Sequence, residues 1–133
     1  MRRVLIVDDH RSTRESLAIG MHAVGFEADT AAGAAAALAL ATEREYNVIV
    51  SDVRMPEVDG ITLCRQLSLI HPGLRFVLMT AYEVTAVESE AVRALGATLL
   101  IKPVTAAALA ACFGAGPSDR PEVPANTKAI GRP

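Results

Sequence analysis

Residues 48–52 read VIVSD, a short β-branched run that ends in an acid. Residues 5–9, which read LIVDD, repeat this arrangement near the N-terminus. Runs of this kind that alternate with helical patterns are typical of parallel strands connected through helices. The strands predicted from these runs are 4–7, 27–30, 48–51, 76–79 and 98–101.

Helical patterns fill the intervals between these strands. A capping box from Ser12 to Glu15 predicts the start of the first helix, and Gly25 predicts its end. The apolar stripe of this helix consists of Leu17, Met21 and Val24. The other predicted helices are 34–44, 60–70, 85–95 and 105–113. The alternation predicts a doubly wound α/β fold, with a five-stranded parallel sheet of order 2-1-3-4-5 and helices on both faces.

The composition agrees with one such domain. Hydrophobic residues make up 51% of the 133 residues and aromatic residues only 4%, so the core must consist of aliphatic side chains. We expect the domain to cover residues 1–113, starting at its natural N-terminus. Residues 114–133 are rich in Pro and Gly and are expected to form a flexible tail or linker.

Charge and hydropathy argue against several other classes of protein. A net charge of −2 does not favour direct binding of nucleic acid by this chain. Because no apolar run approaches about 18 residues, we expect no membrane association and a cytoplasmic location. Cys64 and Cys112 are predicted to be small buried hydrophobic residues rather than a disulfide or a zinc site. The three histidines, which are predicted to lie at the surface or at helix ends and not to bind metal, are His10, His22 and His71.

Polar residues follow four of the five predicted strands. Asp8 and Asp9 follow the first strand, Asp52 the third, Thr80 the fourth and Lys102 the fifth. The carboxyl ends of parallel strands lie along one edge of a sheet, where open α/β folds bind their ligands. The second strand lies at the side of the predicted sheet, which explains why it lacks such a residue.

The residue types at these strand ends suit phosphoryl transfer. Two carboxylates about 4 Å apart repel by roughly 4 kcal/mol at an effective dielectric constant of 20, and a divalent cation removes this cost. Mg²⁺ binds one or two carboxylates together with phosphate oxygens. In this interpretation Asp52 is the nucleophile, Mg²⁺ and Lys102 supply positive charge, and Thr80 supplies a hydroxyl donor.

Four motifs together closely resemble the signature of receiver domains in two-component signalling. They are residues 5–9, residues 51–56 with Asp59-Gly60, Thr80-Ala81, and Lys102-Pro103, and the resemblance spans about residues 3–113. It implies a phosphorylation-dependent signalling switch, in which Asp52 accepts a phosphoryl group from a histidine kinase or a histidine phosphotransfer protein. The switch acts through binding and is not an enzyme, apart from its own phosphotransfer and autodephosphorylation.

The resemblance also implies a ligand set for Mg²⁺. Asp9 and Asp52 would bind the ion directly, the backbone carbonyl of Arg54 would complete the site, and Asp8 would act through water. The donor is expected to dock near the first helix and the loop after Lys102.

Further residues are implied to operate or tune the switch. Lys102 pairs with the phosphoryl group and precedes Pro103 through a peptide bond that is usually cis, and Thr80 moves toward the phosphate on activation. Tyr82, like Arg54, is expected to tune the lifetime of the acyl phosphate. Leu99 stands where the family often has Tyr or Phe, so coupling must run through backbone and helix shifts without an aromatic ring. The face formed by residues 84–113, whose last helix has no charged residue, is a possible contact for a second copy or an effector.

Two other functions stay open at this point. Phosphohydrolases of the haloacid-dehalogenase type also use an aspartate nucleophile, but they usually carry a second aspartate two residues later, where this chain has Arg54. The third possibility is a receiver-like binding module that is not phosphorylated. Taken singly, each acid also has a purely structural interpretation as a helix cap or turn residue.

Overall fold

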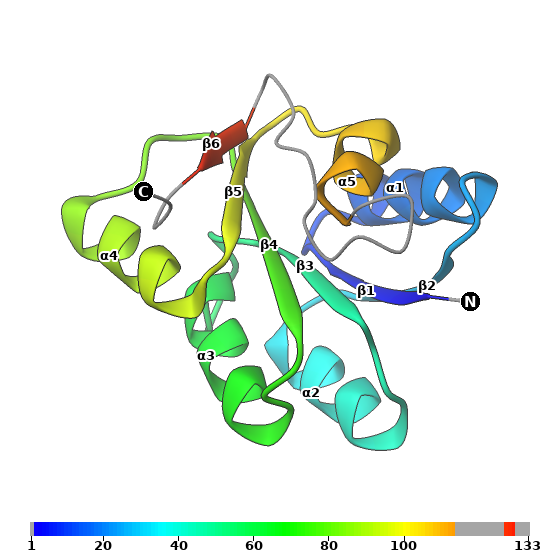
Figure 1. The fold of residues 1–133 in the computed structure, drawn as a ribbon, viewed down its shortest axis with the longest axis horizontal. Helices are drawn as coiled ribbons and strands as arrows, with labels where there is room; N and C mark the ends of the chain where they lie inside the picture. The colour runs from blue at the N-terminus through cyan, green and yellow to red at the C-terminus, as the bar shows by residue number, and fades with distance from the viewer. Residues whose placement is uncertain (1, 114–126, 130–133) are drawn as a thin grey trace.

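The computed structural model describes residues 2–113 and 127–129. Strands and helices alternate along the chain, and the helices cover both faces of one twisted sheet (Figure 1). In chain order the elements are β1 (Arg3–Val7), α1 (Arg11–Ala23), β2 (Glu27–Ala31), α2 (Ala34–Glu43), β3 (Val48–Asp52), α3 (Gly60–Ile70), β4 (Arg75–Thr80), α4 (Ala86–Leu95), β5 (Thr98–Ile101), α5 (Ala106–Phe113) and β6 (Thr127–Ala129). No helix in these residues is long and apolar enough to cross a membrane.

The strand order confirms the predicted topology. Strands β2, β1, β3, β4 and β5 lie side by side in this order and are all parallel. The central strands β1 and β3 are almost completely buried, whereas only one residue of β2 is buried. This difference in burial is expected when helices cover both faces of a parallel sheet and β2 is an edge strand.

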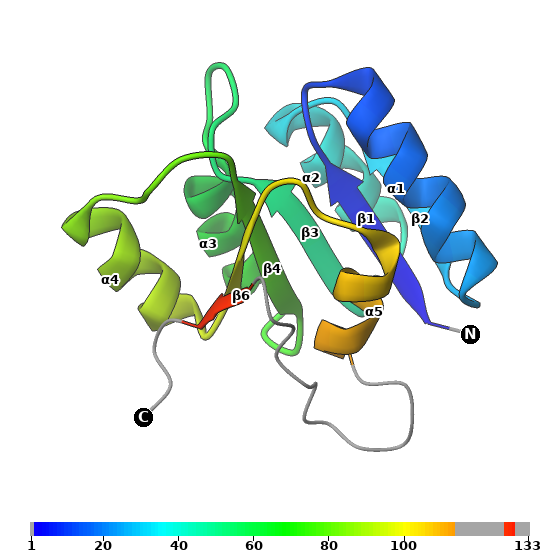
Figure 2. The same ribbon diagram turned by 90° about the horizontal axis from the view of Figure 1, so that it is seen from above.

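Successive residues of the central strands pack alternately into two separate hydrophobic cores. Leu5 and Val7 belong to the core under α2, α3 and α4, whereas Val4 and Ile6 belong to the core under α1 and α5. This alternation follows from the two-residue period of a strand. Figures 1 and 2 show α1 and α5 together on one face of the sheet, with α2 and α3 on the other.

The helix boundaries agree with the predicted ranges, but the predicted N-terminal cap of α1 is wrong. Helix α1 begins at Arg11 after His10, whose side chain makes no capping bond. Glu15 is paired instead with Arg11, four residues earlier, at 2.9 Å. Val24, predicted as part of the apolar stripe, is 48% exposed and lies beyond the end of the helix.

The sheet has a sixth strand that the sequence analysis did not predict. Residues 127–129 pair with β5 in antiparallel orientation, with Thr98 opposite Ala129. Residues 114–126 and 130–133, where the sequence predicts a flexible tail or linker, lie outside the described residues. The predicted domain boundary near residue 113 stays a prediction.

Candidate functional site

Three of the predicted site residues meet at the carboxyl ends of β1, β3 and β5. The Nζ of Lys102 donates to Asp52 Oδ2 at 2.8 Å and to Asp8 Oδ2 at 3.0 Å. Asp8 is completely buried and Asp52 is 5% exposed. Burial lowers the pKa of Lys102, but the hydrogen bonds and charges of Asp52 and Asp8 outweigh it and raise this pKa above its usual value. The lysine is therefore a charged partner of both carboxylates.

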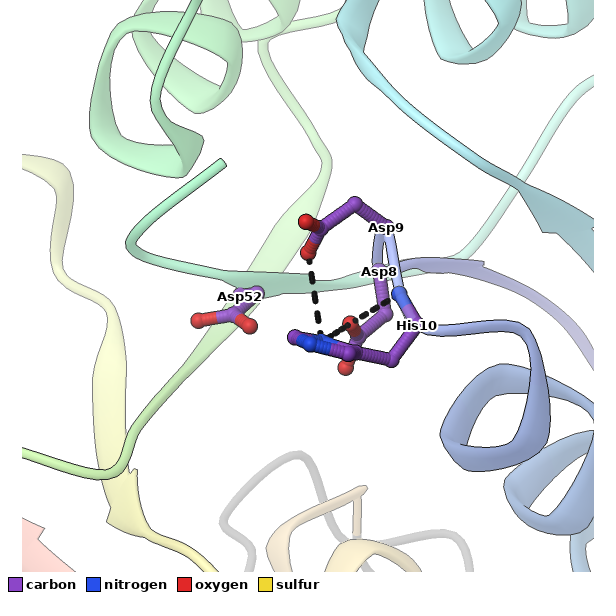
Figure 3. A group of neighbouring side chains, drawn as sticks. All are labelled: Asp8, Asp9, His10 and Asp52. Carbon is purple, nitrogen blue, oxygen red and sulfur yellow. Dashed lines mark hydrogen bonds and ion pairs between the residues drawn. The ribbon is translucent and has the colours of Figure 1, made fainter. Parts of the chain in front are cut away.

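Asp9 and His10 complete a cluster of possible metal ligands. One ligand atom from each of Asp8, Asp9, His10 and Asp52 lies within 4.8 Å of the others (Figure 3). The His10 Nδ1 lies 3.3 Å from Asp8 Oδ1 and 3.4 Å from Asp9 Oδ1. The sequence analysis placed this histidine at a helix end, which is correct, but missed its position beside the acids. The position depends on the path of the short β1–α1 loop, which spacing alone does not define.

The donor chemistry of this cluster fits a divalent cation. Three carboxylates gather here, and the Lys102 ammonium pairs with only two of them, Asp8 and Asp52. Carboxylate oxygens are the protein ligands that Mg²⁺ prefers. The Arg54 N–H donates to Asp52 Oδ1 at 3.2 Å, which places this residue's backbone beside the cluster. Its carbonyl as a ligand stays a prediction.

Thr80 lies at the end of β4 with a fully buried side chain. Its hydroxyl donates to the Tyr82 carbonyl at 3.0 Å and accepts from the Tyr82 N–H at 3.2 Å. Both hydrogen bonds of the Thr80 hydroxyl are therefore with the backbone of the β4–α4 loop, and neither is with Asp52. The Tyr82 side chain is 70% exposed. A move of Thr80 toward Asp52 would require the loop to change.

The loop after β3 is packed tightly against the nucleophile candidate. A Cβ on Gly60 would collide with the backbone carbonyl of Asp52 and would lie 2.7 Å from Ser51 Oγ. Only glycine fits this close approach. Asp59, just before it, accepts a hydrogen bond from Thr62 N at 2.8 Å and caps α3. The structural interpretation of Asp59 is therefore the correct one, and the steric role of Gly60 is one that the sequence analysis missed.

An ion pair connects this region to α4. The Arg54 guanidinium donates to both carboxylate oxygens of Glu88, at 2.8 and 3.0 Å. The pKa of Glu88 is lowered by the hydrogen bond from Arg54 and then by that from the Thr85 N–H. Reciprocal bonds between Thr85 and Glu88 form the capping box of α4. Glu88 was missed in the sequence, although the pattern Thr-x-x-Glu at 85–88 was available as a signal.

The other two residues predicted to operate the switch have defined places. The Lys102–Pro103 peptide bond is cis. Leu99 is completely buried in the core under α2, α3 and α4. Its role in coupling stays a prediction.

A pocket of about 540 Å³ lies beside Lys102, between α1 and the loop after β5. It is lined by Ser12, Thr13, Ser16, Leu17, Lys102, Pro103 and Val104. The pocket coincides with the region where the sequence analysis expects a phosphoryl donor.

Comparisons with known proteins agree with this fold. The family model described as the response regulator receiver domain matches residues 4–113. The response regulator protein FleR of Pseudomonas aeruginosa is 36% identical over 107 residues, which are 80% of this chain and 23% of FleR. The regulatory protein AtoC of Escherichia coli is 34% identical over 103 residues, 77% of this chain and 22% of AtoC. The chain therefore spans about a quarter of the length of these relatives.

Solved structures give the same result. The Vibrio cholerae chemotaxis protein CheY4 has a TM-score of 0.74 at 31% identity, over 82% of this chain and 92% of that protein. A doubly wound sheet with acids and a lysine at its strand ends defines a class of phosphorylation-signalling domains. This chain belongs to the response regulator receiver domain family of two-component systems.

Proposed function

We propose that this receiver domain accepts a phosphoryl group on Asp52 with the help of Mg²⁺. The observation that carries the proposal is the Lys102 ammonium, which bridges Asp52 and Asp8 at 2.8 and 3.0 Å. A half-buried lysine between two buried acids at the edge of a sheet is costly as a structural device. It suits a site that must stabilise additional negative charge on one of those acids.

The proposed metal ligands are the carboxylates of Asp9 and Asp52 and the backbone carbonyl of Arg54, with Asp8 acting through water. When bound, Mg²⁺ would offset the carboxylate charges and draw electron density from the phosphoryl oxygens. A related structure supports Mg²⁺ as the ion: response regulator TrrA from Thermotoga maritima was solved in complex with Mg²⁺ and BeF, at 26% identity and a TM-score of 0.69, over 77% of this chain and 87% of that protein.

The transfer step uses groups that the chain already positions. A carboxylate oxygen of Asp52 attacks the phosphorus of a phosphohistidine, a P–O bond forms, and the P–N bond of the donor breaks. The imidazole leaves and takes a proton from solvent. Lys102 moves its hydrogen bond from the carboxylate to a phosphoryl oxygen, and the Thr80 hydroxyl leaves the Tyr82 carbonyl to donate to another.

The same geometry supports a site for the donor and a surface for the output. A histidine kinase or a histidine phosphotransfer protein would dock over the pocket between α1 and the loop after Lys102, because its imidazole must reach Asp52 from that side. The change at Thr80 would remodel the face of residues 84–113, which would then bind a second copy or an effector. Residues 114–133 would serve as a tail or linker, except for residues 127–129, which pair with β5 as strand β6.

The test is a brief incubation with acetyl phosphate and Mg²⁺, followed by intact-mass spectrometry. We expect one added phosphoryl group, which is absent in Asp52→Asn and absent when the metal is chelated. No addition would favour the receiver-like module that is not phosphorylated. Repeated release of phosphate from a phosphomonoester would favour the haloacid-dehalogenase type of phosphohydrolase. Arg54 argues against that alternative, because it stands two residues after Asp52, where those enzymes usually carry the aspartate that acts as general acid.

A further inference from the structure

Arg54 connects the phosphoryl-accepting aspartate to helix α4. Its backbone N–H donates to Asp52 Oδ1 at 3.2 Å, whereas its guanidinium forms the two-point pair with Glu88 and also donates to the Glu83 carbonyl at 3.3 Å. The backbone of Arg54 therefore contacts the nucleophile candidate, whereas its guanidinium contacts α4. The side chains of Arg54 and Glu88 are 43% and 22% exposed, so water reaches this pair, mainly on the arginine side.

Glu88 takes part in two interactions through one oxygen. Its Oε1 accepts from Arg54 Nη2 at 3.0 Å and from the Thr85 N–H at 2.9 Å. The second of these bonds belongs to the capping box that begins α4. A loss of the ion pair therefore changes the charge balance on the first turn of α4.

Phosphorylation of Asp52 creates a competitor for this guanidinium. A phosphoryl group adds negative charge and acceptor oxygens to the carboxylate beside the Arg54 backbone. Arginine binds phosphate with the same two-point geometry that it uses for carboxylate. Lys102 is already shared between Asp8 and Asp52. In the proposed site Mg²⁺ and Lys102 meet part of the added charge. The Arg54 guanidinium is a further cation beside it, because this residue already contacts Asp52 through its backbone N–H.

We propose that Glu88 is a positioning residue for Arg54, which holds the guanidinium on α4 until a phosphoryl group on Asp52 takes it. The exchange transmits the state of Asp52 to the first turn of α4 without an aromatic switch residue. This inference rests on the proposed function, since it requires that Asp52 be phosphorylated.

The test is a double-mutant cycle on the full chain, with beryllofluoride and Mg²⁺ as the phosphoryl mimic and isothermal titration calorimetry as the measurement. Glu88→Gln removes the charge but keeps an acceptor for the capping box. We expect it to tighten beryllofluoride binding by about two- to fivefold, the range that partly exposed ion pairs contribute. In the Arg54→Ala background the same change should have no effect, because no guanidinium is left to release.

Two variants separate this role from simpler ones. Glu83→Gln removes the same charge from the adjoining β4–α4 loop, but Glu83 contacts Arg54 only through its backbone carbonyl, so binding should stay as in the parent. Thr85→Ala removes the cap hydroxyl and should lower stability without tightening binding. Equal binding by Glu88→Gln and the parent, or an equal gain in the Arg54→Ala background, would overturn the inference alone. A parent protein that neither binds beryllofluoride nor becomes phosphorylated would overturn the proposed function together with it.

Discussion

Replacement of Gly60 by alanine should destabilise the domain and distort its site at the same time. The added Cβ would meet the Asp52 carbonyl oxygen and carbon and the Ser51 hydroxyl. Two of these three atoms are backbone, and the strand that carries them is held by β4: Asp52 pairs with Met79, and the Val53 N–H donates to the Met79 carbonyl at 2.8 Å. The strand cannot yield, so the start of α3 must move.

The expected cost is that of an overpacked core position, about 1–3 kcal/mol in the free energy of unfolding. For a chain of this size, each kcal/mol corresponds to about 4 °C in the melting temperature. Urea unfolding followed by far-UV circular dichroism measures the first quantity. Because the collision falls on the residue that carries the proposed nucleophile, beryllofluoride binding in Mg²⁺ should weaken as well.

Gly73→Ala is the matched control. A Cβ at that position would meet no atom within 4 Å, and its backbone does not require glycine, so stability should stay within about 0.5 kcal/mol of the parent. If Gly60→Ala behaved like this control, with unchanged unfolding and unchanged beryllofluoride binding, the close approach of α3 to the end of β3 would not hold.

Three further predictions follow from the packing and the charges. Gly20→Ala should cost about 1–3 kcal/mol, because its Cβ would lie 2.5 Å from that of Ala106 on α5; Gly20→Ala combined with Ala106→Gly should recover part of the urea midpoint, and no recovery would contradict this contact. Burial raises the pKa of Cys64 to about 12 and that of Cys112 to about 11. The stability that these neutral thiols contribute is present below pH 9 and is lost as the pH rises toward 12, so the free energy of unfolding of the Cys64→Ala/Cys112→Ala variant, measured with urea, should fall less steeply over this range than that of the parent. An equal fall in the two proteins would argue against this effect. Lys102→Met should bind Mg²⁺ several-fold more tightly in calorimetry, because the ammonium competes with the metal for the carboxylates of Asp8 and Asp52. The same variant should bind beryllofluoride more weakly, because the ammonium stabilises the phosphoryl group. Weaker binding of Mg²⁺ by the variant would refute the competition.

The sequence was sufficient to predict the five parallel strands and the residues that end them. Parallel strands must share one edge for their carboxyl ends, so the convergence of Asp8, Asp52 and Lys102 follows once the strands are located. The contacts that the sequence did not predict depend on loops. The places of His10 and Glu88 are set by the paths of the β1–α1 and β4–α4 loops, which no periodic pattern encodes.

The two capping patterns illustrate why local signals are incomplete. Ser12 to Glu15 and Thr85 to Glu88 have the same spacing, yet only the second forms a capping box. In α1 the carboxylate of Glu15 binds Arg11, a partner that the helix itself places four residues away. The residue types alone do not decide which partner a glutamate takes. Strand β6 was missed for a related reason, because three residues pair only when a distant edge is available.

The pairing of β6 with β5 limits how this molecule can associate with others. A free strand edge presents unpaired N–H and C=O groups that recruit strands from neighbouring molecules. Residues 127–129 occupy that edge on β5, so among the described strands the two edges of the sheet are β2 and the three-residue strand β6. Glu27 and Asp29 give β2 an acidic border, which Arg44 covers in part through its bond to Asp29. A charged strand at one edge and a strand of only three residues at the other both disfavour growth of the sheet from one molecule to the next.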